Sequence, residues 1–368
     1  MAQDFTATVL DEVRLNLEEA FLDSRIDLPL KSTPISMLAM FERQTARASA
    51  LLDESAQECV GYKVEYLKND SNALPTVDAT AGGFACEIPL GATLDSATKT
   101  YDLNVFITET FSVSDNDCDN SMKFARKAAK ATAAAMQKIC LSLNDYLITE
   151  LVANAQTPSY PGESGTIVGN TIEYPAANFK GDLATETVGE FYEIAQVEKI
   201  APSYFVLNGK NFNVAQIVSQ FTAADDDKRS RAVALRFGDK MEFDINNLDT
   251  SAGSDSSFIV DNNMYVCAFN NAYTPEMQPL ADDVQVFTLP LTYYDQFTGR
   301  VEQVMLYDGA REEMVPVLVD VEYQQKCDAN SKNRTRKTLH TFRATLRGLF
   351  NFAPGDGGST GVIQVVKV

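Results

Sequence analysis

One long helical pattern, at residues 119–154, constrains the fold of this 368-residue chain more than any other feature. Small and apolar side chains recur there at steps of three and four, which places them on one face of a single helix. The members of this stripe are Met122, Ala125, Ala129, Ala133, Met136, Cys140, Leu143, Leu147 and Leu151. Because each helical residue adds about 1.5 Å, the helix spans on the order of 50 Å. The chain must therefore fold around a rod.

Positive charge gathers in the amino-terminal half of this rod, where the helix dipole favours anions instead. Five residues form this cationic strip: Lys123, Arg126, Lys127, Lys130 and Lys138. The chain as a whole carries 31 Lys and Arg against 51 Asp and Glu, a net charge of 31 − 51 = −20. The strip is either a solvated helix face or a contact with acidic surface on another subunit. We also expect the small-residue flank of the rod to face other copies of the chain.

The acidic balance argues against a general nucleic-acid binder, because phosphate contacts are made chiefly by Lys and Arg. The first residues lack the basic and apolar regions of a secretory signal, and no apolar run is long enough to cross a membrane. We therefore expect a soluble cytoplasmic chain. The six cysteines are widely spaced without a C-x-x-C pair and are predicted to be reduced packing residues. They are Cys59, Cys86, Cys118, Cys140, Cys267 and Cys327.

Catalytic motifs are not predicted. His340 is the only histidine, which rules out a multi-histidine metal site, and its strand-like surroundings favour a structural role. Residues 115–120 begin like a calcium loop, but Asn120 stands where glycine is needed and Arg126 where a bidentate glutamate is needed. No glycine-rich nucleotide-binding motif occurs. We therefore expect no catalytic residues, no metal, no cofactor and no enzymatic activity.

The amino-terminal residues 1–55 are predicted to form a helical arm. Within residues 8–21, apolar side chains stand four apart and predict an amphipathic helix. These side chains are Val9, Val13, Leu17 and Phe21. Thr33 and Pro34 then have the pattern of a helix start, for a second helix that reaches Leu52.

Residues 56–110 predict a long two-stranded excursion with a polar, glycine-containing tip. Alternating residues that include Tyr62 and Tyr66 form the outgoing strand, and Phe84 lies on the return. Two strands alone are barely stable in water, so the excursion must lie on the rest of the chain or on a neighbour. With the arm, it supplies our candidate apolar inter-subunit contacts: Val9, Val13, Leu17, Tyr62, Tyr66 and Phe84.

Beyond the rod, the pattern alternates between short helices and many strands. A capping box at residues 187–190 begins a short helix, and residues 202–212 (PSYFVLNGKNF) predict a buried strand that turns into a helix at 212–221. Strands are expected near 233–245, 258–269 and 284–293 and in most of the remainder. The fold class is α+β, and no fixed-period repeat indicates a solenoid or propeller.

This order of elements, together with residues 119–154 and 202–212, resembles the major capsid proteins of tailed bacteriophages with the HK97-type fold. The resemblance implies a spine helix in a peripheral (P) domain, an extended E-loop and a central (A) domain. The implied parts are an N-terminal arm at 1–55, the E-loop at 56–110, the P domain at 111–185, the A domain at 186–335 with P-domain strands from about 284, and a return at 336–368.

The resemblance implies a chain that self-assembles as pentamers and hexamers into an icosahedral head shell. Such a shell encloses double-stranded DNA without sequence-specific binding, and it is assembled in the host cytoplasm without a membrane. Scaffolding, portal and decoration proteins are its implied partners. Two alternatives stay open: an encapsulin-like or other virion shell protein, and a carboxylate-based hydrolase with the rod as its core.

Overall fold

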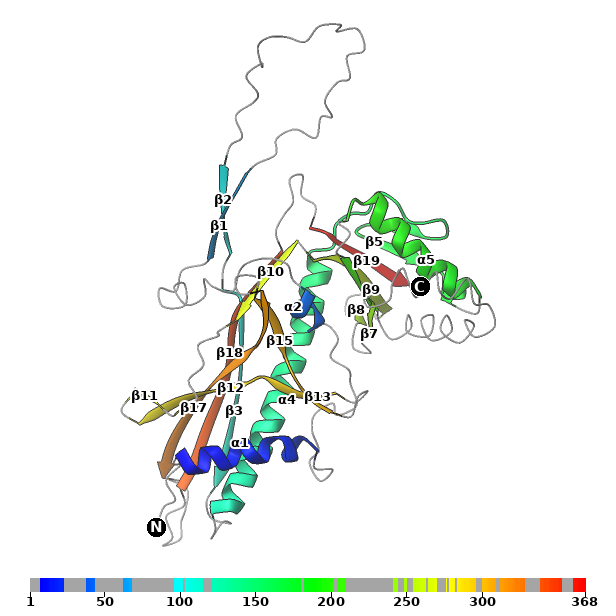
Figure 1. Ribbon diagram of the computed structural model, residues 1–368. Coiled ribbons are helices and arrows are strands. Elements are labelled where there is room, and N and C mark those ends of the chain that lie inside the picture. The colour runs from blue at the N-terminus through cyan, green and yellow to red at the C-terminus, as the bar shows by residue number, and fades with distance from the viewer. Residues whose placement is uncertain are drawn as a thin grey trace, which may run out of the picture.

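The computed structural model describes the elements that frame the molecule (Figure 1). The described residues are 7–22, 38–43, 62–67, 96–101, 103–114, 121–179, 182–200, 204–208, 241–243, 248–249, 254–262, 264–269, 276, 278–281, 283–295, 300–308, 312–327, 338–352 and 360–368. The predicted helix at 212–221 and most of the predicted strand at 233–245 lie outside them. Of the predicted second arm helix, only α2 at Ala39–Arg43 is described.

The rod is helix α4, Ser121–Ala153, a single helix of 33 residues that runs the length of the main body in Figure 1. The predicted stripe is its buried face, as far as side chains are described. Ala125, Ala129 and Ala133 are fully buried in the chain's own core. The expectation that this small-residue flank faces other copies is therefore wrong, because α4 uses it to pack within the chain.

A six-stranded antiparallel sheet, here called the main sheet, lies along α4. Its strands run in the order β10, β18, β17, β12 and β11, with β3 also paired to β18. The bounds are β3 Val105–Ser114, β10 Tyr265–Phe269, β11 Gln278–Ala281, β12 Val284–Pro290, β17 Leu318–Cys327 and β18 Thr338–Phe352. Gly348 pairs with Val105 of β3 and with Phe269 of β10, so these two strands flank opposite edges of β18.

Strand alternation decides which side of the main sheet meets α4. On β18, His340, Phe342 and Ala344 are buried, whereas Arg343 and Arg347 between and beyond them are exposed. Successive side chains of a strand point to opposite faces, so one face joins the core and the other is polar. Stacking of Phe111 on Phe342, with ring centroids 5.0 Å apart, adds to the inner face.

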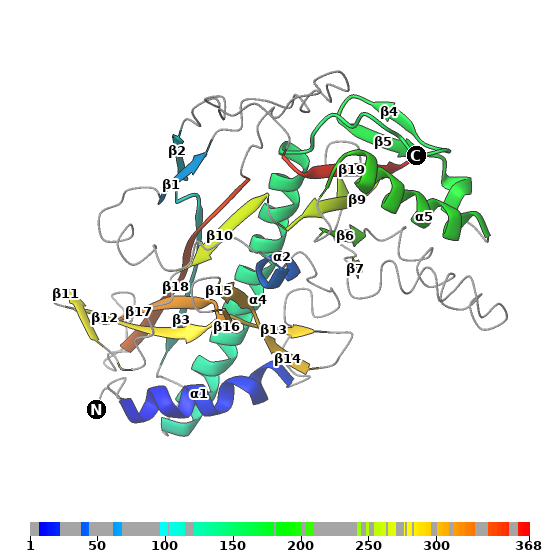
Figure 2. The same ribbon diagram turned by 45° about the horizontal axis from the view of Figure 1, so that its top comes forward.

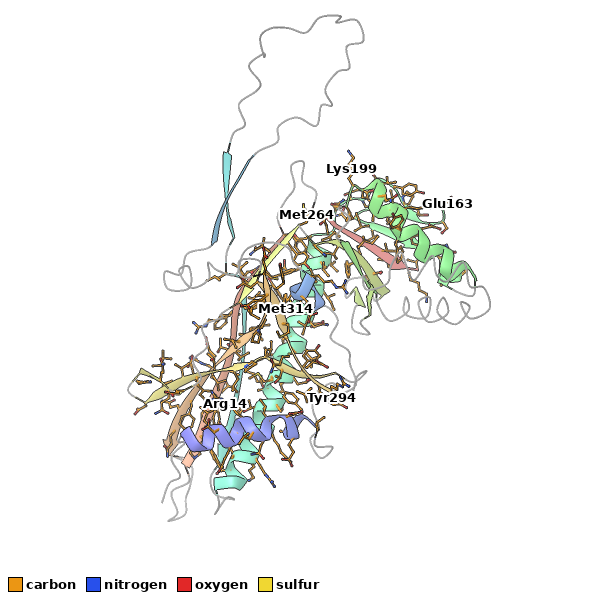
Figure 3. All side chains as sticks on the ribbon, in the orientation of Figure 1. Arg14, Glu163, Lys199, Met264, Tyr294 and Met314 are labelled. Carbon is orange, nitrogen blue, oxygen red and sulfur yellow. The ribbon has the colours of Figure 1, made fainter. Side chains whose placement is uncertain are left out.

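Helix α1, Ala7–Leu22, crosses the amino-terminal half of α4 in Figures 1 and 2. Two small hairpins lie farther along α4: β13 Thr292–Asp295 with β14 Arg300–Gln303, and β15 Met305–Asp308 with β16 Glu313–Pro316. Tyr294 of β13, which Figure 3 labels, donates its N–H to the buried Gln137 Oε1 of α4 at 3.0 Å, and this bond fixes β13 to the helix.

A second sheet stands at the carboxyl-terminal end of α4. Its order is β4, β5, β19, β9, β6 and β7, and β8 also pairs with β9. The bounds are β4 Thr166–Val168, β5 Thr171–Tyr174, β6 Tyr204–Asn208, β7 Met241–Phe243, β8 Leu248–Asp249, β9 Ser254–Asp261 and β19 Val362–Lys367. Phe258 and Val260 of β9 join the core around α4, whereas Ile259 joins a separate core under helix α5, Asp182–Val197. Both faces of this sheet are therefore covered.

The two sheets do not divide the chain where the sequence suggested. The predicted strand at 258–269 is two strands, β9 in the second sheet and β10 in the main sheet. Residues 166–174, expected in the P domain, lie in the second sheet, and the strands of 265–327 lie outside it. The chain crosses between the sheets three times, from α4 to β4, from β9 to β10 and from β18 to β19.

These three crossings meet at one junction, where Figure 3 places Met264. The Gln156 Oε1 accepts hydrogen bonds from the N–H groups of Thr360 at 3.1 Å and Gly361 at 3.0 Å. The Asp261 N–H donates to the Gly361 carbonyl at 2.9 Å. Residues from all three crossings are thus bound to one another, which fixes the second sheet to the end of α4.

Candidate self-association surface

The cationic strip lies on α4 beside its crossing with α1. Arg126 and Lys127 are exposed, and Lys130 is partly exposed. Lys123 belongs to the first turn of the helix, but its side chain is outside the described part. The first turn of α4 contains no acidic residue. The strip therefore presents positive charge on the surface of a strongly acidic chain.

Lys138 has a different role from the one expected. Its Nζ lies 2.5 Å from Glu109 Oε1 on the inner face of β3, so this cation forms an ion pair within the chain. The pair joins the middle of α4 to the edge of the main sheet. Assignment of Lys138 to a contact between subunits is therefore corrected, because its charge already has a partner in its own fold.

The apolar stripe of α1 also turns inward. Val13 and Leu17 are 2% and 9% exposed and belong to the core around α4. Val9 is in the helix, with its side chain outside the described part. Because α1 lies directly across α4, its stripe is covered within the chain, and Val13 and Leu17 are not available to a neighbour.

The opposite face of α1 is the one that reaches the surface. Its exposed members are Asp11, Leu15, Glu18, Glu19 and Leu22, here called the outward face of α1. Leu15 is 81% and Leu22 49% exposed. Two exposed leucines among three carboxylates are unusual, because apolar side chains are normally placed toward the core. The sequence analysis missed them, although their spacing of seven residues places both on one side of the helix.

The predicted excursion is present as the hairpin of β1, Tyr62–Leu67, and β2, Ser96–Tyr101. Tyr62 pairs with Tyr101 and Tyr66 with Ala97 in antiparallel register. The two strands form a sheet of their own and stand away from both larger sheets in Figure 1. Phe84 lies outside the described residues.

Farther along the chain, Phe106 of β3 is 70% exposed and adds a large apolar side chain to the surface.

His340 lies in the core. It is fully buried, its Nδ1 lies 2.8 Å from the Tyr323 hydroxyl, and its ring packs against Phe124 of α4 with centroids 4.4 Å apart. Substrate could not reach the ring without opening the contact between α4 and the main sheet. The structural role expected for this residue agrees with its position.

Cys140 and Cys267 are free thiols and are fully buried. Burial raises the pKa of each thiol well above its ordinary value. Since the thiolate is the reactive species, neither group is poised as a nucleophile. The side chains of the other four cysteines lie outside the described part of the chain.

Glu190 of α5 and Glu198, which directly follows α5, hold the loop after α4. Glu198 Oε1 accepts hydrogen bonds from the Ser159 N–H at 2.5 Å and the Tyr160 N–H at 3.0 Å. Glu190 accepts from the Ser164 hydroxyl at 2.8 Å and from the Tyr174 hydroxyl at 2.9 Å. These carboxylates therefore satisfy loop donors, a structural use of acidic residues.

The described part of the chain contains no group of three or more His, Cys, Asp or Glu side chains that could hold a metal ion. Among the helices described, none has the length and apolarity required to cross a membrane. The exposed residues of α1 and α4 form the candidate self-association surface.

Neither protein-family models nor curated proteins provide a match to this chain. Among solved structures, it is similar to "Mycobacterium phage Che8" at 12% identity and TM-score 0.47, over 94% of this chain and 95% of that one. It is similar to "Cyanophage Pam1 capsid asymmetric unit" at 12% identity and TM-score 0.41, over 84% of each chain. A third is "The capsid of Myoviridae Phage XM1", at 11% identity and TM-score 0.40, over 84% of this chain and 86% of that one.

Proposed function

We propose that this chain is a major capsid protein of the HK97 type, which self-assembles into the icosahedral head shell of a tailed bacteriophage. The order of the elements supports the proposal: a leading helix, a separate hairpin, a 33-residue rod on an antiparallel sheet, and a second sheet at the carboxyl-terminal end of the rod. This is the order that the sequence resemblance implied for the arm, E-loop, spine helix and A domain.

The hairpin of β1 and β2 is the observation that carries the proposal. A two-stranded sheet is marginally stable by itself in water, and these strands pair only with each other among the described strands. A shell supplies what such a hairpin lacks, because neighbouring subunits can cover its apolar side. The proposed E-loop comprises residues 56–110, and Tyr62 and Tyr66 are its proposed contacts.

The proposed domains follow the sheets. The arm comprises residues 1–55, and the P domain comprises α4 with the main sheet. The A domain is built on the second sheet and α5, with β19 returning to it at the end of the chain. In this assignment the A domain takes strands from both before and after residues 186–335, since β4, β5 and β19 pair there.

The net charge of −20 is consistent with a container for DNA. An acidic wall repels phosphates, so packaged double-stranded DNA is enclosed without being bound at specific sequences. The chain acts through assembly as pentamers and hexamers, without catalysis or a cofactor. Scaffolding, portal and decoration proteins are its proposed partners in the host cytoplasm, and the finished virion is its destination.

Electron microscopy of the purified full-length chain tests the proposal. The expected result is closed shells or their pentameric and hexameric units. A chain that remains a monomer of about its own mass, 40.4 kDa, over a wide concentration range would overturn it and favour the carboxylate-based hydrolase. Shells that form and co-purify with an enclosed protein cargo instead of DNA would favour the encapsulin-like alternative.

A further inference from the structure

One leg of the β1–β2 hairpin is joined to the main sheet through residues 102–104, which separate β2 from β3. The hairpin pairs with neither larger sheet and stands away from both in Figure 1. Val105, the first residue of β3, lies opposite Gly348 of β18. The chain therefore leaves the main sheet at Asn104, and the contacts of this residue bear on where the hairpin points.

The side chain of Asn104 takes the place of a backbone partner at this point. In the register of the two strands, Leu103 would lie opposite Phe350 if β3 continued for two more residues. Instead, the Phe350 N–H donates to Asn104 Oδ1 at 2.8 Å, and Asn104 Nδ2 donates to the Phe350 carbonyl at 2.7 Å. One amide thus completes a pair of ladder bonds and lets the backbone turn away from the sheet.

Phe350 is a rigid point of attachment for this amide. The residue is fully buried and lies opposite Cys267 of β10, on the other edge of β18. Its ring packs edge-on against Phe352 with centroids 5.2 Å apart, and it also lies near the rings of Phe41 and Tyr265. A side chain bound to the Phe350 backbone is therefore held by the core of the molecule.

A second attachment ties Asn104 to α4. Its Nδ2 also donates to the Tyr146 hydroxyl, at 2.7 Å. Burial and the neighbouring Glu150 raise the pKa of Tyr146, so the hydroxyl stays protonated and donates to Glu150 while it accepts from Asn104. The amide is thus held between a strand of the main sheet and the rod.

We propose that Asn104 is the positioning residue that sets the direction in which the proposed E-loop leaves the body. This inference rests on the proposed function, because the direction matters only if a neighbouring subunit must receive the hairpin. The three hydrogen bonds of Asn104 to Phe350 and Tyr146 are here called the Asn104 clamp. A hairpin held in one direction loses less freedom when it binds, so the clamp favours assembly without itself touching a neighbour.

Asparagine fits this position better than the residues closest to it in size. The clamp requires one acceptor, for the Phe350 N–H, and two N–H donors, for the Phe350 carbonyl and the Tyr146 hydroxyl, and an asparagine amide supplies all three. An ionised aspartate keeps the acceptor but has no donor, and a leucine has neither. Because Asn104 is exposed, water can satisfy the Phe350 backbone after either change. The fold should then persist while the hairpin loses its fixed direction.

Three variants of the full-length chain test the clamp. Asn104→Asp removes both donors with little change of size, Asn104→Leu removes the whole clamp, and Tyr146→Phe removes only the attachment to α4. Ser112→Ala is the control. It removes a side-chain bond between the same two strands, the 3.2 Å contact of Ser112 with Thr341, away from the hairpin. Ser112 is exposed, as Asn104 is.

Sedimentation velocity and electron microscopy measure the chain concentration at which closed shells, or their pentameric and hexameric units, form. We expect both Asn104 variants to need at least about tenfold more chain than the wild type, since only a fraction of their hairpins then point in the direction that a neighbour receives. Tyr146→Phe should need an intermediate concentration, and Ser112→Ala should assemble as the wild type does. Below the assembly concentration, Asn104→Leu and Ser112→Ala should have similar midpoints of urea denaturation, which separates positioning from loss of the fold.

Amide hydrogen exchange of the unassembled chain reports on the clamp directly. The Phe350 N–H should exchange slowly in the wild type, because Asn104 Oδ1 accepts its hydrogen. It should exchange faster in Asn104→Leu, whereas amides in the middle of β18 should not change.

Asn104 variants that assemble at the wild-type concentration would overturn the clamp and leave the shell proposal intact. A Ser112→Ala control that is impaired as strongly would do the same. A wild type that forms neither shells nor their units overturns the proposed function, and the clamp with it. If the Asn104 variants do not fold, two other results decide: slow exchange of the Phe350 N–H in the wild type with impaired assembly of Tyr146→Phe supports the clamp, and failure of either overturns it.

Discussion

Replacement of Gly348 by alanine is the most direct test of the main sheet, because the site is crowded by backbone as well as side chain. A Cβ added at Gly348 would lie 2.4 Å from Cδ1 of Phe269 and 2.6 Å from the carbonyl oxygen of Ala268. The Phe269 ring is itself buried and packs on Phe41 with centroids 4.8 Å apart, so it cannot easily turn away. The carbonyl belongs to β10, which is paired with β18 at this point.

Overpacking of a well-packed core costs about 1–3 kcal/mol, and we expect Gly348→Ala to lower the free energy of unfolding by that amount. Gly189→Ala is the matched control. A Cβ at Gly189 meets nothing within 4 Å, and the residue lies inside α5, so alanine should stabilise the helix by about 0.5–1 kcal/mol. The same chemical change should therefore have opposite signs at the two sites.

Urea denaturation followed by far-ultraviolet circular dichroism measures both effects. All three proteins must be compared at one chain concentration, because association with other copies adds to apparent stability. If Gly348→Ala is as stable as the wild type, β10 does not approach β18 as described, and the reasoning about the junction of these strands fails. A destabilising Gly189→Ala would contradict the placement of that residue in an open helix position.

Three further predictions concern groups that the fold buries or holds. Tyr323→Phe removes the hydroxyl that lies 2.8 Å from His340 Nδ1. In the same denaturation assay it should lower the free energy of unfolding by about 0.5–1.5 kcal/mol. An unchanged free energy of unfolding would contradict this contact. Glu198→Ala should speed amide hydrogen exchange at Ser159 and Tyr160, because both N–H groups lose their acceptor, whereas the exposed Gln196→Ala should leave exchange there unchanged. Burial raises the pKa of the Cys140 and Cys267 thiols in the folded chain. Their contribution to stability is therefore complete below the ordinary thiol pKa of 9.0. It is lost as pH rises above that value, because the thiols then ionise in the unfolded chain but not in the folded one. Alkylation of these two thiols should accordingly require unfolding, and rapid labelling of the folded chain at neutral pH would contradict their burial.

Much of the architecture was predictable because local periodicity carries it. The stripe from Met122 to Leu151 anticipated α4 to within two residues at its start and one at its end. The strand pattern likewise predicted the hairpin of β1 and β2. A helix near residues 187–197 was also predicted, but the capping box at 187–190 does not begin it, because α5 begins at Asp182. Strand partners were not predictable, because pairing depends on residues far apart in the chain. Thus the apolar run at 258–269 gave no sign that it divides between two sheets.

The candidate surface was predicted only in part. The cations at Arg126 and Lys127 are exposed as a solvent-facing or docking strip requires, but Lys138 is paired with Glu109 from a strand 29 residues earlier. Nothing local to α4 indicates that partner. For α1 the sequence analysis followed the apolar stripe through Val13 and Leu17, whereas the exposed leucines on the other face are the surface that remains available.

The amino-acid sequence by itself determined that the chain has a long rod, an α+β pattern, a strongly acidic surface and a single histidine in a strand, because composition and periodicity are properties of short segments. Only the tertiary structure decided whether the apolar side of each helix is covered by its own chain or by a neighbour. A stripe on α1 or α4 gains the same free energy by burial against its own chain as against a neighbour, and the choice depends on which surface lies within reach once the strands of the main sheet are paired.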